Sequence, residues 1–216
     1  MKNIKKKAYY TIIFTLSFTL SGCIDIFQHI TKDGNGVDRN TIKVTVSKVV
    51  FAMANGMSGA GDADYEKLFN ESNTVDVQEY TQFNASIKTV NDSMDVGYLV
   101  DMNIDYQDKN MVTAVNQSNT SFIPKYKDNN ITIHIARLGG DSDSAEDNDM
   151  AAAFLATAKY RLTVSKTCIA DIDRVTVKTR ENEKEITALD LYDNYLIEIP
   201  MPIIFMSDID LTLYSK

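Results

Sequence analysis

Apolar and polar residues alternate along two long stretches of the sequence. From Val96 to Gln107 an apolar side chain occupies every even position, and five of the six odd positions are Gly, Asp, Asn or Gln. The same period of two runs from Phe154 to Ser165. Successive side chains of a β-strand point to opposite faces, so this period predicts strands with one buried and one solvated face. Shorter stretches with this pattern are Ile42–Val46, Ile131–Ile135, Val175–Val177 and Ile209–Leu213.

Clusters of polar turn-forming residues separate these stretches. They lie at residues 91–93, 107–110, 128–130, 181–184 and 193–194. Many short strands divided by such turns are typical of sandwiches and barrels. With 44% hydrophobic residues in a chain of 216, a packed core can form. We therefore expect a mainly β fold, specifically an antiparallel β-sandwich, with a small β-barrel as the alternative.

Helical signals are few. Asp64–Phe69 could form a turn or two, and the residues after Ser144 could open another, so we expect one or two short helices. Pro200 and Pro202 lack a backbone N–H and cannot donate within a sheet. The segment Ile199–Met206 is therefore expected to be an edge strand or to carry a bulge.

The N-terminus has the pattern of a secretory signal peptide. Lys2, Lys5, Lys6 and Lys7 give it a positive start, and the uncharged, mainly apolar run Ala8–Leu20 follows. A membrane-spanning helix needs roughly 20 apolar residues, which is more than this run supplies. An uncleaved membrane anchor is the alternative interpretation.

The apolar run ends in Leu20-Ser21-Gly22-Cys23. This sequence resembles the lipobox of bacterial lipoproteins, in which an aliphatic and two small residues precede a cysteine. The resemblance implies cleavage between Gly22 and Cys23 and attachment of lipid, including palmitate, to Cys23. It also implies a place in the cell envelope. Because Ile24 rather than aspartate follows Cys23, the outer membrane is favoured over the inner one if the cell has two.

Three parts of the chain follow from this interpretation. Residues 1–22 are the lipoprotein signal peptide, residues 23–40 an acylated N-terminus and flexible tether, and residues 41–216 a single β-rich domain. The turn-rich piece Asp33–Gly36 motivates the tether. Removal of residues 1–22 takes away four of the 22 basic residues and none of the 30 acidic ones, which leaves a net charge of −12. That charge disfavours binding to nucleic acid or to anionic lipid.

One acidic loop is a candidate for weak calcium binding. Hard carboxylate oxygens are the ligands that calcium prefers. The loop supplies them from Asp141, Asp143, Glu146, Asp147 and Asp149. Alanine at position 145 breaks the EF-hand pattern, so an ordinary solvated acidic loop is the main interpretation, and no cofactor is expected besides the lipid.

The sequence contains no recognisable set of catalytic residues. The chain has only two histidines, His29 and His134, and one cysteine besides Cys23, which is Cys168. We expect Cys168 to be a buried structural thiol near the end of a strand. The glycines of Gly56–Gly61 lack the spacing of a phosphate-binding loop. An enzyme would need His134 or Cys168 in a cleft beside carboxylates.

These observations predict a membrane-anchored lipoprotein with an extracytoplasmic, non-catalytic β domain. Its expected work is binding or structural support, with a protein partner in the envelope or at the surface and no nucleic acid. The alternative function is a carrier or sensor of an apolar small ligand in a barrel-like cavity, which needs an enclosed apolar volume of several hundred Å³.

Overall fold

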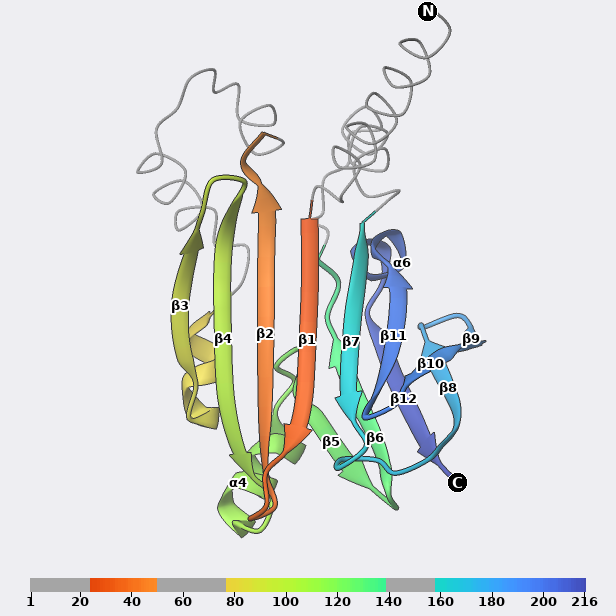
Figure 1. Ribbon diagram of the computed structural model, residues 1–216. Helices are drawn as coiled ribbons and strands as arrows, with labels where there is room; N and C mark the ends of the chain where they lie inside the picture. Colours follow the sequence, from red (N-terminus) through yellow and green to blue (C-terminus); the bar gives the residue numbers. More distant parts are fainter. Residues whose placement is uncertain (1–23, 50–76, 139–157) are drawn as a thin grey trace, which may run out of the picture.

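Two β-sheets pack face to face in the computed structural model, which describes residues 24–49, 77–138 and 158–216 (Figure 1). The strands are β1 Ile24–Lys32, β2 Val37–Ser47, β3 Ser86–Asn91, β4 Asp95–Asp105, β5 Pro124–Lys127, β6 Asn130–Ile135, β7 Lys159–Ser165, β8 Ile172–Lys178, β9 Glu183–Ile186, β10 Ala188–Leu191, β11 Asn194–Pro200 and β12 Ile209–Ser215. The helices are the 3-10 helix η1 Val77–Phe83, α4 Lys109–Gln117 and α6 Met201–Met206.

The larger sheet has seven strands in the order β10-β11-β7-β1-β2-β4-β3, and the smaller has five in the order β5-β6-β12-β8-β9. All the pairings are antiparallel except that of β1 with β7, which is parallel. Both sheets have free edges, so they do not close into a barrel. The sandwich prediction is confirmed, the larger sheet is mixed rather than purely antiparallel, and the small-barrel alternative is wrong.

The core lies between the facing sides of the two sheets. The alternation predicted from the sequence holds in β4, where Val100, Met102 and Ile104 are buried, and in β7, where Tyr160, Leu162 and Val164 are buried. The smaller sheet contributes every second residue of β6 and β12 to the same cluster. Because each strand buries one of its two rows of side chains, the period of two in the sequence identifies the residues that form the core.

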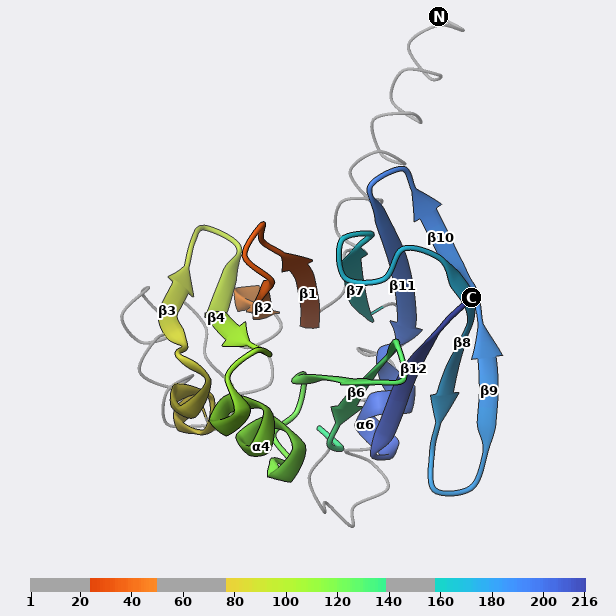
Figure 2. The ribbon, with the colours of Figure 1, turned by 90° about the horizontal axis from the view of Figure 1, so that it is seen from below.

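The larger sheet curves, and its concave side is filled by different elements along its width (Figure 2). The smaller sheet covers the part around β7 and β11, whereas η1 and α4 lie beside β4. Helix α4 begins after Asp108, whose carboxylate accepts a hydrogen bond from the backbone N–H of Asn110. The expected polar turn at 107–110 is therefore also the start of a helix that we did not predict.

The expected edge strand or bulge at Ile199–Met206 is wrong. Strand β11 ends at Pro200, and α6 follows with Pro202 in its first turn. A helix leaves its first N–H groups without internal partners, so proline costs nothing there. The expected helices at Asp64–Phe69 and after Ser144 fall outside the described residues.

The expected tether over residues 23–40 is also wrong from Ile24 onward. Strand β1 begins at Ile24 and lies between β2 and β7 in the larger sheet. Its side chains Ile26 and Ile30 are almost fully buried. The turn-rich piece Asp33–Gly36 is the hairpin turn between β1 and β2, in which Asp33 accepts the N–H groups of Asn35 and Val37.

Candidate functional site

The predicted lipid attachment point, Cys23, immediately precedes the first described strand in the sequence. Gly22 and Cys23 lie outside the described residues, but the next residue, Ile24, opens β1. Ile24 pairs with Val46 at the far end of β2, so it sits at an end of the sandwich rather than on its side. A lipid on Cys23 would therefore hold the domain without a linker.

A set of polar side chains occupies core positions of β1 and β2. Gln28 and Asn40 are fully buried and point to the core face. The Gln28 amide donates to the Asn40 side-chain oxygen at 2.8 Å and to the Phe122 carbonyl at 2.8 Å. Asn40 donates to the same carbonyl at 2.9 Å, and the Tyr160 hydroxyl donates to Gln28 Oε1 at 2.6 Å. The hydrogen-bonding capacity of this cluster is well used, which is what buried polar groups require.

The backbone at Phe122 is held in an unusual conformation by this cluster. Its φ is +65°, a region that bulky L-residues rarely adopt. The two amide donors fix its carbonyl, and its own N–H donates to the His134 carbonyl of the smaller sheet at 2.9 Å. The segment before β5 thus ties the two sheets together, and the strain is held by contacts on both sides.

A second polar group surrounds Asp38, which is also fully buried. The Tyr126 hydroxyl donates to Asp38 Oδ2, and the Lys32 ammonium lies 3.6 Å from Oδ1, which has no hydrogen bond. Burial raises the pKa of the Asp38 carboxyl, while Tyr126 and Lys32 act against that rise. Tyr126 stacks edge-on against Tyr106 with ring centroids 4.7 Å apart.

Cys168 lies three residues beyond the end of β7, beside the Asp38 group, and it is half-buried rather than fully buried as expected from the sequence. Burial, with a contribution from the Asp38 charge, raises the pKa of its thiol to about 11. A thiol with this pKa stays protonated at neutral pH and is a poor nucleophile.

The two histidines lie on the outer faces of the sheets. His29 is on β1, where its Nδ1 is 2.7 Å from the Thr163 hydroxyl, and burial followed by the Arg39 charge lowers its pKa. His134 is on β6, where its Nδ1 is 2.9 Å from Asp210. His134 thus pairs with a carboxylate on the outside of the smaller sheet, whereas Cys168 contacts Tyr126, and the structure does not bring them together.

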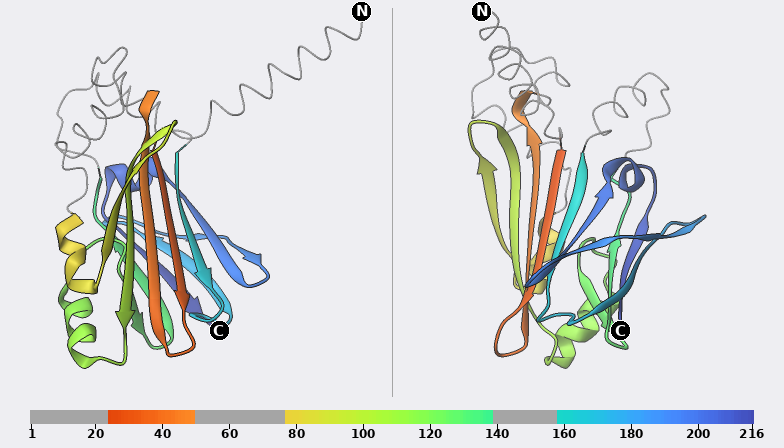
Figure 3. Two further views of the ribbon diagram at one scale, coloured as in Figure 1. Left: turned by 60° about the vertical axis from the view of Figure 1, so that its left-hand side comes forward. Right: turned by 45° about the vertical axis from the view of Figure 1, so that its right-hand side comes forward.

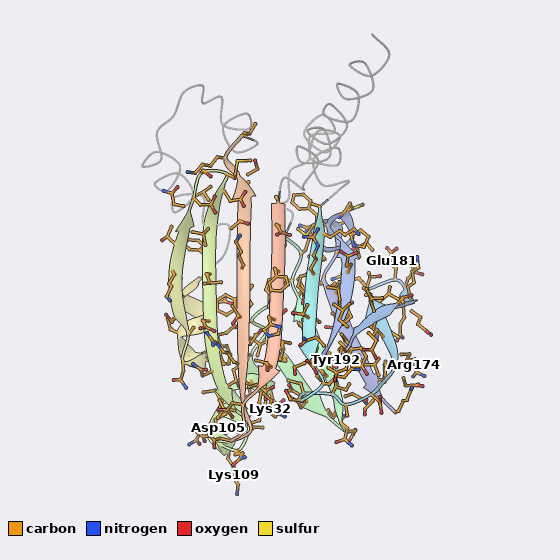
Figure 4. The ribbon with its side chains drawn as sticks, viewed as in Figure 1. Lys32, Asp105, Lys109, Arg174, Glu181 and Tyr192 are labelled. Carbon is orange, nitrogen blue, oxygen red and sulfur yellow. The ribbon has the colours of Figure 1, made fainter. Side chains whose placement is uncertain are left out.

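A cleft of about 370 Å³ lies at one edge of the sandwich, where β8 and β9 of the smaller sheet approach β10 and β11 of the larger one. The chain passes from β9 to β10 through Thr187 alone. Val175, Ile186 and Tyr195 contribute apolar surface, and charged groups from Asp173, Arg174 and Glu185 also line it. Figure 4 shows Arg174 on this side of the molecule. An open cleft with a charged lining suits a small polar group better than an apolar ligand.

Several predicted sites lie outside the described residues, including the acidic loop with Asp141, Asp143, Glu146, Asp147 and Asp149 and the glycines of 56–61. Across residues 24–49, 77–138 and 158–216, no three His, Cys, Asp or Glu side chains gather closely enough to hold a metal ion. Within those same ranges no helix has the length and apolar character to cross a bilayer.

Comparison with known proteins adds one structural likeness. No protein-family model matches the sequence, and no curated protein matches it significantly. One solved structure, the NMR structure of the folded domain of LppM from Mycobacterium tuberculosis, aligns over 91% of this chain and 92% of that chain, with 12% sequence identity and a TM-score of 0.37. A likeness at that TM-score defines neither the fold nor the function of this chain.

The buried polar residues were not predicted from the sequence. Gln28, Asp38 and Asn40 occupy positions that a simple alternation assigns to apolar side chains. Gln28 is two residues from Ile26 and Ile30, and Asp38 and Asn40 are four and two residues before Ile42, so these even spacings are the signal that could have placed them in strands.

Proposed function

We propose that the protein is a bacterial lipoprotein, held in the cell envelope by lipid on Cys23, whose β domain binds or supports a partner and catalyses no reaction. The observation that carries this proposal is the sequence Leu20-Ser21-Gly22-Cys23 behind a positive and then apolar N-terminus. The position of β1 supports it, because cleavage before Cys23 would leave every described strand intact.

The non-catalytic part of the proposal rests on where the reactive side chains lie. His29 and His134 are on outer faces beside Thr163 and Asp210, and the thiol of Cys168 is protonated at neutral pH. The polar residues Gln28, Asp38 and Asn40 of the core are fully buried and therefore closed off from solvent. Rigid scaffolds of this kind present their loops and edges to partners.

The environment that we propose follows from the same residues. Two or more acyl chains hold a protein at a membrane durably, whereas one does so only marginally. Isoleucine after Cys23 favours the outer membrane if the cell has two. The partner is a protein of the envelope or surface, since a net charge of −12 after cleavage opposes binding to nucleic acid.

The apolar-carrier alternative receives no support from the fold. It needed a barrel-like cavity, and the two sheets remain open at their edges. The cleft between β8 and β10 is open and carries charged side chains.

Metabolic labelling with an alkyne analogue of palmitate tests the anchor. We expect label in the wild type and in Cys168→Ala, and none in Cys23→Ala. Cys168→Ala is the matched control, because Cys168 is the chain's only other cysteine. Label that persists in Cys23→Ala, or no label in the wild type, would contradict the proposed anchor.

A further inference from the structure

One end of the sandwich gathers segments that are far apart in the sequence. In the larger sheet Ile24 pairs with Val46, Val46 with Val96, and Val96 with Asn91. The start of β1, the end of β2 and the turn between β3 and β4 therefore lie in one row, at the top in Figure 1 and in both views of Figure 3. We call this the anchor end, because Cys23 immediately precedes Ile24.

Helix α6 belongs to the same end. Tyr160, close to the start of β7, pairs with Ile26 of β1 and with Ile199 of β11. Pro200 ends β11 one residue further, and α6 begins at Met201. The figures agree with this register, since α6 lies beside the start of β7 in each view (Figure 3).

The anchor end exposes apolar side chains that the fold leaves uncovered. Six large hydrophobic residues are exposed in the described part of the chain, and three of them belong to this end. Val49 follows β2 and is 64% exposed, Met94 in the β3–β4 turn is 64% exposed, and Met206 at the end of α6 is 75% exposed. Exposed apolar side chains gathered at one end of a domain are a feature of surfaces that contact a partner or a membrane.

Helix α6 has no polar side at all. Its sequence, Met-Pro-Ile-Ile-Phe-Met, contains no polar or charged side chain. Met201 and Ile204 are buried, whereas Ile203 and Phe205 pack only partly against the core. A helix that is apolar all round is suited to an apolar environment, and of the six residues of α6 only Met206 is exposed to solvent.

The charges near this end largely compensate one another. Arg161 binds Asp25 at 2.8 Å and Glu198 at 3.2 Å, and Lys159 binds Glu198 at 2.7 Å. Asp92 accepts two backbone N–H groups of its own turn. Figure 4 places the charged side chains of Lys32, Asp105 and Lys109 at the opposite end. Among the described residues, much of the charge at the anchor end is therefore paired.

We propose that the anchor end is a second membrane contact, in which Met94, Met206 and the outer side of α6 enter the headgroup layer of the bilayer. This inference rests on the proposed lipid at Cys23. Because no linker follows Cys23, the acyl chains keep these side chains close to the membrane surface. Their effective concentration at the membrane is therefore high. The domain then stands on its end with the strands running away from the membrane.

A single introduced tryptophan can report this contact, because the chain contains none. The mature lipidated protein would carry Met206→Trp or Met94→Trp and be reconstituted into phosphatidylcholine vesicles with brominated acyl chains. Tyr192→Trp is the matched control, since Tyr192 is 88% exposed and lies at the β10–β11 turn, away from the anchor end. An interfacial group sits roughly 5–10 Å into the headgroup region, so we expect about a twofold loss of emission at positions 94 and 206.

Quenching at positions 94 and 206 that is no greater than at position 192 would overturn the proposal. The emission at positions 94 and 206 could also change in native envelope membranes and not in pure lipid vesicles. That result would overturn the proposed membrane contact in favour of a protein partner at this end. A second arm separates this inference from the anchor itself. The mature chain starting at Cys23, with Cys168→Ser, is coupled through the Cys23 thiol to a maleimide lipid, so the surface contact is measured even if cells never acylate Cys23.

Discussion

Ile30 lies in the middle of the larger sheet, and its replacement by alanine tests whether β1 is a structural strand. Its side chain is 0% exposed. It sits in β1 between Asn40 of β2 and Val164 of β7. Truncation of a buried isoleucine to alanine costs about 2–5 kcal/mol, so Ile30→Ala should lose that much free energy of unfolding. Thr31→Ala is the matched control on the outer face, with an expected change within about 0.5 kcal/mol.

Complete removal of β1 should have a larger effect. A chain that starts at Thr41 loses the burial of Ile26 and Ile30, which is worth roughly 3–6 kcal/mol in total. It also separates β10-β11-β7 from β2-β4-β3 and exposes two new sheet edges. Small domains have only about 5–15 kcal/mol of stability, so this chain should not unfold cooperatively.

Urea unfolding followed by far-ultraviolet circular dichroism measures both effects, with the chain starting at Ile24 as the reference. An Ile30→Ala midpoint equal to that of the reference would refute the placement of β1 in the core. A chain from Thr41 that unfolds with the same midpoint would show that residues 24–40 are a tether after all.

Three further predictions concern single side chains. Burial raises the pKa of the Asp38 carboxyl above its ordinary value of 3.8. The contribution of Asp38 to stability is therefore greatest below pH 3.8 and falls as the pH rises through the pKa of the folded state. Asp38→Asn should flatten this fall, as measured by urea midpoints at pH values from about 4 to 8. The thiol pKa of Cys168 is about 11, against an ordinary value of 9.0, so the folded chain should contain about 100-fold less thiolate than the unfolded chain. A chromogenic disulfide reagent should therefore react slowly with the folded chain that starts at Ile24 and quickly with the same chain in urea. Equal reaction rates would contradict this prediction. A Cβ at Gly97 would lie 2.0 Å from the Val44 carbonyl oxygen, so Gly97→Ala should lower the free energy of unfolding by about 1–3 kcal/mol or more. Gly34→Ala is the control: no atom lies within 4 Å of a Cβ at Gly34, so this variant should unfold like the wild type.

The period of two in the sequence predicted most of the core. It placed Val100, Met102 and Ile104 of β4 on one buried face, as the structure has them. The polar cluster at 128–130 was a reliable turn signal, because Asp128 and Asn129 both adopt positive φ in the two-residue turn between β5 and β6. These features depend only on neighbouring residues, which is why the sequence alone revealed them.

The buried polar residues prevented the prediction of β1 and of the first part of β2 from the sequence. Gln28, Asp38 and Asn40 stand where the alternation calls for apolar side chains, so residues 24–40 look like a polar tether. Their burial is possible because Tyr160, Tyr126 and the Phe122 carbonyl provide partners from distant segments. The sequence around these residues gives no indication of those hydrogen-bond partners.

The exposed apolar end could not be predicted either. Val49, Met94 and Met206 come from three separate segments, and only the register of the larger sheet and the position of α6 place them together. Pro200 and Pro202 suggested a sheet edge, whereas Pro200 is the N-cap residue of α6 and Pro202 lies in its first turn.

Mass spectrometry of the N-terminal peptide of the protein isolated from cell membranes tests the lipid anchor at Cys23. We predict that the mature chain begins at Cys23 and that its mass includes the lipid on the Cys23 thiol. A peptide that begins at Met1 and carries an unmodified Cys23 would contradict it.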